Sequence, residues 1–300
     1  MYKLLKKYKK HTGPLYAVAY SKKHNLLFTG GSDKVVATWD LDKGESTPLS
    51  IKTDSAVLNF QLLNNEKHLF IGLFNGDFHI VDIDTRKEIS FFNRHKLGVF
   101  SSCYLSDRNL LFVGAGDGTL SIWNTKCFKL LASHQLGKGK IRAIQSVDND
   151  VFIANSQGHI FTINLFSIEE YSLFTTINHP IFCLNNFSSN NSLLIGDKNA
   201  HLTEIEIENK QIIKSIPAHN WPIYKIEWLN ENEFVTCSRD KIVKIWDANS
   251  MKVKQRLCFP EFQGHLNSVN NLVSISSIET IVSVGDDKQI CLWRKWQTFL

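Results

Sequence analysis

The chain has 300 residues, of which 43% are hydrophobic and 21% charged, and it carries a formal net charge of +5. These values are typical of a globular domain, and no apolar run approaches the roughly 18 residues that a membrane span needs, so we expect none. The positive charge resides on many lysines and only seven arginines, which argues against nucleic acid as a partner.

The first elements in chain order are short and rich in residues that favour strands. Residues 15–20 are expected to form one strand, and residues 26–29 form a second apolar run. Residues 30–33 carry the Gly, Ser and Asp of a tight turn, and residues 35–39 are again rich in β-branched residues. Strand, tight turn and strand indicate a hairpin, and a more polar strand is expected after it.

The same order of elements returns along the chain at a near-constant spacing. The apolar residue that ends the third strand recurs at intervals of 42, 42, 40, 42, 41 and 47 residues, and an Asp, Asn or Gln stands six positions before it. Seven units of about forty residues, each with four short strands and no long helix, predict an all-β protein. We expect a seven-bladed β-propeller of four-stranded antiparallel blades. The recurring residues are Trp39, Val81, Trp123, Ile163, Ile205, Trp246 and Trp293.

Four of these units share a more specific motif. In each, a His stands 27 or 28 residues before a Trp, and an Asp lies between them. This pattern resembles the WD-repeat (Trp-Asp repeat) propellers, and the resemblance covers essentially all 300 residues, as a single domain spanning 1–300. The four sets are His11, Asp33 and Trp39; His95, Asp117 and Trp123; His219, Asp240 and Trp246; and His265, Asp287 and Trp293.

The resemblance implies a buried hydrogen-bond relay within these units. In the family, the Asp accepts from the His, the His engages a Ser or Thr four positions before the Asp, and that hydroxyl meets the Trp indole. Val113 occupies the hydroxyl position of unit three, which predicts a broken relay there. A hydroxyl, His and Asp also suggest hydrolytic catalysis, but their repetition from unit to unit favours a structural role. Complete tetrads are predicted as His11, Thr29, Asp33 and Trp39; His219, Thr236, Asp240 and Trp246; and His265, Ser283, Asp287 and Trp293.

The N-terminal segment is expected to close the ring. The apolar positions of residues 2–9 match those of residues 210–217, which precede the sixth unit as an outer strand. The chain stops shortly after Trp293, so unit seven lacks a fourth strand of its own. We therefore expect residues 2–9 to form the outer strand of blade seven, with lysines that protect its edge from pairing with other chains.

The family also implies that partners bind on the top face, where the loops between blades gather with the turns between second and third strands. One position of the first strand, followed through the repeats, forms a ring of Tyr16, Leu58, Phe100, Arg142, Phe182, Tyr224 and Asn270. Aromatic and Arg residues dominate interface hot spots. In the alternative interpretation, Phe100 and Phe182 turn inward and plug the channel. The predicted partner-binding residues are Tyr16, Phe74, Phe100, Arg142, Phe182, Tyr224 and Arg239.

These patterns predict a non-catalytic scaffold or adaptor that binds protein or peptide partners, as a monomeric ring within a hetero-complex. Lys140, Lys198, Arg142 and Arg239 add positive charge, which favours a short peptide with an apolar anchor and an acidic group. The alternative is a propeller enzyme acting at the central channel, although the ring positions hold no Asp or Glu.

We expect no catalytic residues, no metal and no cofactor, because the other histidines lack ligand spacing. The six cysteines lie far apart, without a C-x-x-C pair. This indicates reduced thiols in an intracellular protein. The expected location is the cytoplasm, with the nucleus as the alternative.

Overall fold

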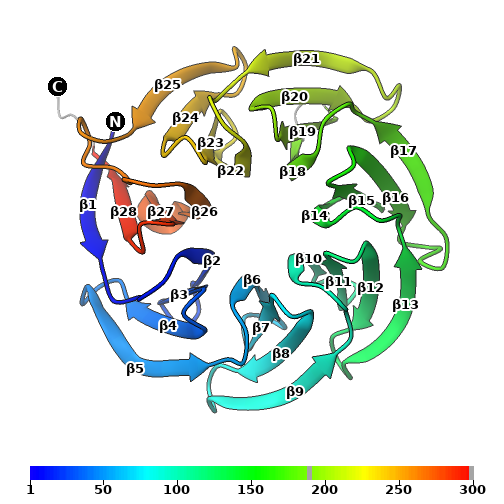
Figure 1. Cartoon of the computed structure of the whole chain (residues 1–300), viewed down its shortest axis with the longest axis horizontal. Helices are drawn as coiled ribbons and strands as arrows, with labels where there is room; N and C mark the ends of the chain where they lie inside the picture. Colours follow the sequence, from blue (N-terminus) through cyan, green and yellow to red (C-terminus); the bar gives the residue numbers. More distant parts are fainter. Residues whose placement is uncertain (188–190, 297–300) are drawn as a thin grey trace.

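Four short strands pair side by side in each repeat, and each strand runs antiparallel to its neighbour. The described residues form seven such four-stranded sheets. The computed structural model describes residues 1–187 and 191–296. The sheets stand around a central channel as the blades of a propeller (Figure 1). The predicted fold class is confirmed. Within the described residues, no helix is long and apolar enough to cross a membrane.

Blades one to six each take their four strands in chain order. Blade one comprises β2 (Leu15–Ser21), β3 (Leu26–Gly31), β4 (Val35–Asp40) and β5 (Glu45–Lys52). Blade two comprises β6 (Val57–Leu63), β7 (His68–Leu73), β8 (Asp77–Asp82) and β9 (Lys87–Asn93). Blade three comprises β10 (Val99–Leu105), β11 (Leu110–Ala115), β12 (Thr119–Asn124) and β13 (Lys129–Gln135). Blade four comprises β14 (Ile141–Val147), β15 (Asp150–Asn155), β16 (His159–Asn164) and β17 (Ser172–Thr176).

The last blade departs from this order, because its outer strand comes from the start of the chain. Blade five comprises β18 (Ile181–Phe187), β19 (Ser192–Asp197), β20 (His201–Glu206) and β21 (Ile212–Pro217). Blade six comprises β22 (Ile223–Asn230), β23 (Glu233–Ser238), β24 (Val243–Asp247) and β25 (Lys252–Leu257). Blade seven comprises β26 (Val269–Ile275), a short 3₁₀ turn (Ser276–Ile278), β27 (Thr280–Gly285), β28 (Ile290–Lys295) and β1 (Tyr2–Tyr8).

The closing strand β1 pairs antiparallel with β28, as predicted, and ends one residue earlier than the predicted range. Leu4 lies opposite Trp293, and Tyr8 lies opposite Ile290. A bulge between Leu4 and Lys6 shifts the register. The first and last strands of the ring are thereby joined by a ladder of backbone hydrogen bonds (Figure 1).

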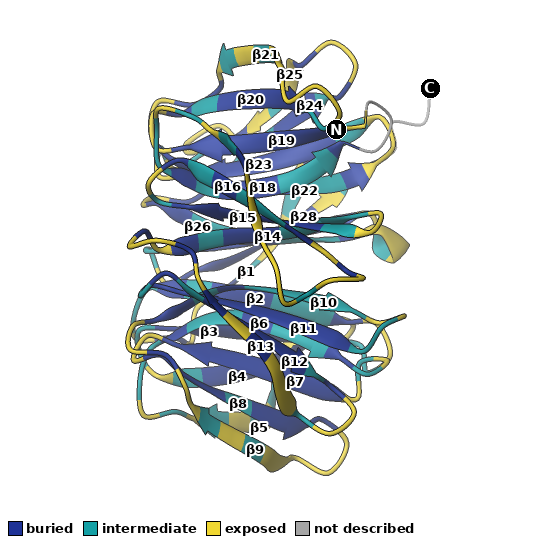
Figure 2. Ribbon diagram, turned by 90° about the vertical axis from the view of Figure 1, so that its right-hand side faces the viewer, coloured by how far each residue is buried: buried dark blue, intermediate teal, exposed yellow. Residues whose placement is uncertain are grey.

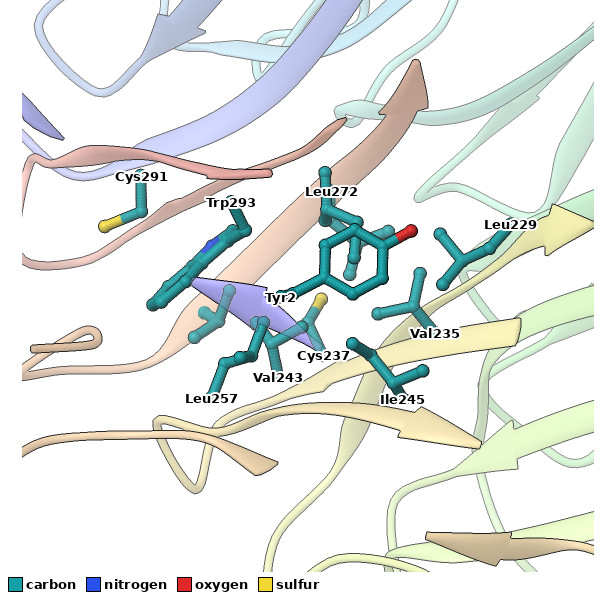
Figure 3. Packing of buried hydrophobic residues seen from close by; sticks show 12 residues of the cluster. Tyr2, Leu229, Val235, Cys237, Val243, Ile245, Leu257, Leu272, Cys291 and Trp293 are labelled. Carbon is teal, nitrogen blue, oxygen red and sulfur yellow. The ribbon is translucent and has the colours of Figure 1, made fainter. Parts of the chain in front are cut away.

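The hydrophobic cores lie between neighbouring blades, and β1 contributes to two of them. Tyr2 packs into the cluster of blades six and seven, together with Leu257 and Trp293 (Figure 3). Tyr8 belongs to the cluster between blades seven and one, where its ring centroid lies 4.8 Å from that of Trp39. Both ends of the closing strand are therefore anchored by a buried aromatic side chain.

Burial differs between the strands of a blade. The middle strands, such as β7 and β11, are buried throughout, whereas first strands such as β10 and β22 are largely half-buried and outer strands such as β9 and β13 are largely exposed (Figure 2). We call the face that carries the loops between blades and the turns between second and third strands the top face. The first strand of each blade lines the channel, so its residues near the top face surround the channel mouth.

Candidate functional site

Hydrogen bonds tie the top-face loops to their blades. In blade one, His11 Nδ1 lies 2.7 Å from Asp33 Oδ2, and His11 Nε2 lies 2.8 Å from the hydroxyl of Thr29. The indole of Trp39 donates to the same hydroxyl at 2.8 Å. The corresponding distances in blades six and seven lie between 2.7 and 2.9 Å. Their residues are His219, Thr236, Asp240 and Trp246, and His265, Ser283, Asp287 and Trp293.

Blade three has a broken relay, as predicted, but the break does not lie at Val113. Ser121 on β12 supplies the hydroxyl, which lies 3.0 Å from His95 Nε2 and accepts the Trp123 indole N–H at 2.8 Å. Ser121 is the cross-strand partner of Val113, so the hydroxyl has moved to the neighbouring strand. The relay is broken at the carboxylate, because His95 Nδ1 lies 3.9 Å from Asp117 Oδ1 and has no hydrogen-bond partner among the described residues.

One cavity of about 860 Å³ opens at the channel mouth and continues between the first strands. Every member of the predicted ring lines it, and so does Phe74, which is 60% exposed. Arg239 does not line it. Phe100 and Phe182 both line this cavity and are half-buried.

Arg142 occupies the centre of this arrangement. Its guanidinium lies 4.4 Å from the ring centroid of Phe100 and 4.8 Å from that of Phe182, an arrangement we call the Arg142 clamp. Burial lowers the pKa of the Arg142 guanidinium, although Tyr224 opposes this effect. Its Nε is buried and has no hydrogen-bond partner among the described residues. The clamp therefore holds a positive charge in a partly dry site with little compensation.

Sequence reasoning missed an exposed aromatic residue on the same face. Trp221 is 53% exposed, and the guanidinium of Arg239 lies 4.9 Å from its ring centroid. Trp221 precedes its first strand by two residues, a position that was not followed through the repeats. In blade three that position holds Leu97, which is 52% exposed and close to Gly116. Following this position through the repeats as well would have revealed both residues.

The cavity is poor in carboxylates. Among the described residues that line it, the one acidic side chain is Glu227, whose carboxylate lies 3.5 Å from the ammonium of Lys225. A pair of converging carboxylates, as used in general acid and base catalysis, is not formed by the described residues lining the cavity.

The ring of seven sheets with histidine relays defines a WD-repeat propeller. A family model described as "WD domain, G-beta repeat" matches residues 2–40, 86–124, 210–247 and 256–294, which together make up more than half of the chain. The protein therefore belongs to the WD40 family. Each match ends at the third strand of a blade that carries a His, an Asp and a Trp. These blades are one, three, six and seven.

The curated relatives are distant and longer. The chain is 22% identical to protein tipD of Dictyostelium discoideum over 97% of this chain and 48% of that protein. It is 23% identical to WD repeat-containing protein 55 of Rattus norvegicus, over 81% of this chain and 64% of that protein. It is also 23% identical to pre-mRNA-processing factor 17 of Homo sapiens, over 79% of this chain and 43% of that protein. The chain thus spans roughly half the length of these relatives.

Proposed function

We propose that this protein is a non-catalytic adaptor that holds an extended segment of a protein partner at the top mouth of its channel. The Arg142 clamp carries the proposal. Its guanidinium is stacked between two aromatic rings, lines a cavity of about 860 Å³ and forms no ion pair with the described residues. A charge withdrawn from water is costly until a partner compensates it, so an incoming carboxylate is favoured at this point.

The rest of the mouth indicates what should stand beside that carboxylate. Phe74 is well exposed, and Tyr16 and Tyr224 are half-buried around the same cavity. Exposed aromatic side chains on a folded surface are typical of interface hot spots. A partner segment with an acidic side chain next to an apolar one would satisfy both the clamp and these rings.

The relatives support a role within an assembly. Pre-mRNA-processing factor 17 is named for the processing of pre-mRNA, and WD repeat-containing protein 55 is named for its repeats alone. We propose that this chain likewise serves as one subunit of a hetero-complex. Its cytoplasmic location stays a prediction from the sequence. The channel enzyme is the weaker candidate, because Glu227 is already paired with Lys225.

The proposal is tested by capture from cell extract with a matched pair of variants. Arg142→Gln removes the clamped charge at the mouth. Arg108→Gln removes an arginine stacked at 4.7 Å on Phe166, outside the channel mouth, and serves as the control. A partner bound by the wild type and by Arg108→Gln should bind Arg142→Gln about tenfold or more weakly, as expected for a buried charge pair.

The partner's own acidic residue provides the complementary test. Replacing its Asp or Glu by the matching amide should weaken binding to the wild type but add little to the effect of Arg142→Gln. Undiminished binding by folded Arg142→Gln would contradict the proposal. If binding of the partner is instead lost in the Trp221→Ala variant, the contact lies on blade six.

A further inference from the structure

A second cavity, of about 380 Å³, lies where the ring closes. Three segments that are distant in sequence form its walls: β1, the turn between β4 and β5, and β28. Its apolar walls are Leu5, Leu41 and Leu292. We call it the seam cavity, since it separates the first blade from the strand that completes the last one.

The seam cavity is bordered mainly by positive charge. Lys6, Lys43 and Arg294 line it, whereas Asp42 is the one acidic residue among the described lining residues. The carboxylate of Asp42 already accepts a hydrogen bond from Asn25 at 2.5 Å. Because opposite charges attract most strongly where water is partly excluded, this border favours an anion.

The cations of the cavity are unequally engaged. The ammonium of Lys6 donates to the carbonyl oxygen of Gly44 at 2.7 Å, and that of Lys43 lies 3.6 Å from Asp40. Arg294 is exposed and forms no ion pair with the described part of the chain. Its planar guanidinium is therefore available for a carboxylate or phosphate, which it can bind through two hydrogen bonds.

Tyr8 provides an independent indication of a ligand. The residue is only 6% exposed and lines the seam cavity. Its phenolic oxygen is buried and has no hydrogen-bond partner among the described residues. Burial, together with the nearby carboxylate of Asp40, raises the pKa of Tyr8. The phenol therefore remains protonated and can donate a hydrogen bond to an anionic oxygen.

We propose that the seam cavity binds a small amphiphilic anion, an acidic head group on a short apolar stem. The head accepts the hydrogen bond of Tyr8 and pairs with Arg294 and Lys43, while the stem lies against the leucines. Such a ligand contacts both β1 and blade one, so its binding strengthens the closure of the ring by mass action. The site shares no residue with the channel mouth and does not depend on the proposed adaptor function.

The probes separate head group from stem. Hexanoate and hexyl phosphate each carry both parts, 1-hexanol carries the stem alone, and inorganic phosphate carries the head alone. Titration followed by NMR should show saturable binding of at least one six-carbon anion, with each single-part probe at least tenfold weaker. The better of the two anions identifies the head as carboxylate or phosphate. The bound anion should also slow amide hydrogen exchange in β1.

Three variants connect the binding to the site. Tyr8→Phe keeps the ring that stacks on Trp39 and should weaken binding about tenfold, while the melting temperature of the free protein stays equal or rises. Arg294→Gln should also weaken binding, whereas Lys9→Gln, an exposed charge outside the cavity, should not. The proposal is overturned if no probe saturates, or if Lys9→Gln weakens binding as much as Arg294→Gln. A lower melting temperature of free Tyr8→Phe would also overturn it, since the phenol would then have a partner within the protein.

Discussion

Blades six and three join a top-face loop to its blade with the same kinds of residue, yet they distribute the hydrogen bonds differently. In blade six the hydroxyl comes from Thr236 on the second strand, and His219 Nδ1 lies 2.8 Å from Asp240. In blade three the hydroxyl comes from the third strand, and His95 Nδ1 lies 3.9 Å from Asp117. In blade three the hydroxyl has thus changed strands, and the hydrogen bond from the imidazole to the carboxylate is absent.

Strand pairing explains why the exchange is tolerated. Directly paired residues on neighbouring strands lie on the same face of a sheet, about 4.5–5.5 Å apart. Thr29 pairs with Ala37 in blade one, and Val113 pairs with Ser121 in blade three. The small polar residue and its apolar partner have thus exchanged places. The indole keeps its acceptor, while the imidazole follows the hydroxyl away from the carboxylate.

The largest difference should appear when the carboxylates are removed. Asp240→Ala is expected to lower the free energy of unfolding by about 3–5 kcal/mol, because it leaves the buried imidazole of His219 unpaired. Asp117→Ala should cost about 1–2 kcal/mol, since Asp117 accepts mainly from the backbone N–H groups of Lys96 and Thr119. Urea denaturation measures both. Equal losses would show that the two blades do not differ in this bond.

Acid should affect blade three through its histidine. Burial lowers the pKa of His95 to about 4, although Asp117 opposes this. In the unfolded chain the same imidazole has its ordinary pKa of 6.5. The contribution of His95 to the free energy of unfolding is therefore complete above pH 6.5 and declines as the pH falls towards 4. The full loss is about 3 kcal/mol, at about 1.4 kcal/mol per pH unit. An NMR titration of the imidazole checks this, and a midpoint near 6.5 would contradict it.

Moving the hydroxyl back should make blade three resemble blade one. Ser121→Ala removes the oxygen shared by His95 and Trp123 and should cost about 2 kcal/mol. Adding Val113→Thr restores a hydroxyl on the second strand, and the double variant should recover most of that loss. It should also raise the pKa of His95, because the imidazole returns towards Asp117. If the double variant is no more stable than Ser121→Ala, then the position of the hydroxyl does not govern the relay.

The comparison extends to the blades that lack this relay. Blades two, four and five carry neither the Trp nor a complete tetrad, so their top-face loops should open more readily. We expect the free energy of opening these loops to be about 1 kcal/mol lower than that of the loop of blade six. This difference corresponds to about fivefold faster amide exchange. Hydrogen exchange followed by mass spectrometry would measure it, and equal protection in all seven blades would refute it.

The fold could be predicted because every unit repeats the same spacing. Strict register places equivalent residues at equivalent sites, which is why the ring from Tyr16 to Asn270 lines one cavity. The closing strand could be predicted from the matching apolar positions of residues 2–9. These features depend on local pattern and repetition, and a sequence displays both directly.

Other features depend on contacts between segments that the pattern does not connect. The role of Ser121 follows from its pairing with Val113, which only the register of β11 and β12 reveals. The clamp depends on how a long side chain packs between rings of neighbouring blades. Trp221 was missed because it lies before the first strand, outside the ring of positions from Tyr16 to Asn270. Tyr8 was expected to be a strand residue and not the wall of a cavity.

The closing strand also has a consequence for biosynthesis. The ribosome makes β1 before β28, the strand with which β1 pairs, and β28 emerges nearly three hundred residues later. Throughout that interval Tyr2 and Tyr8 lack the blade-seven side chains that bury them. The ring therefore cannot close until β28 has been made, and until then β1 exposes two aromatic side chains that the folded protein buries.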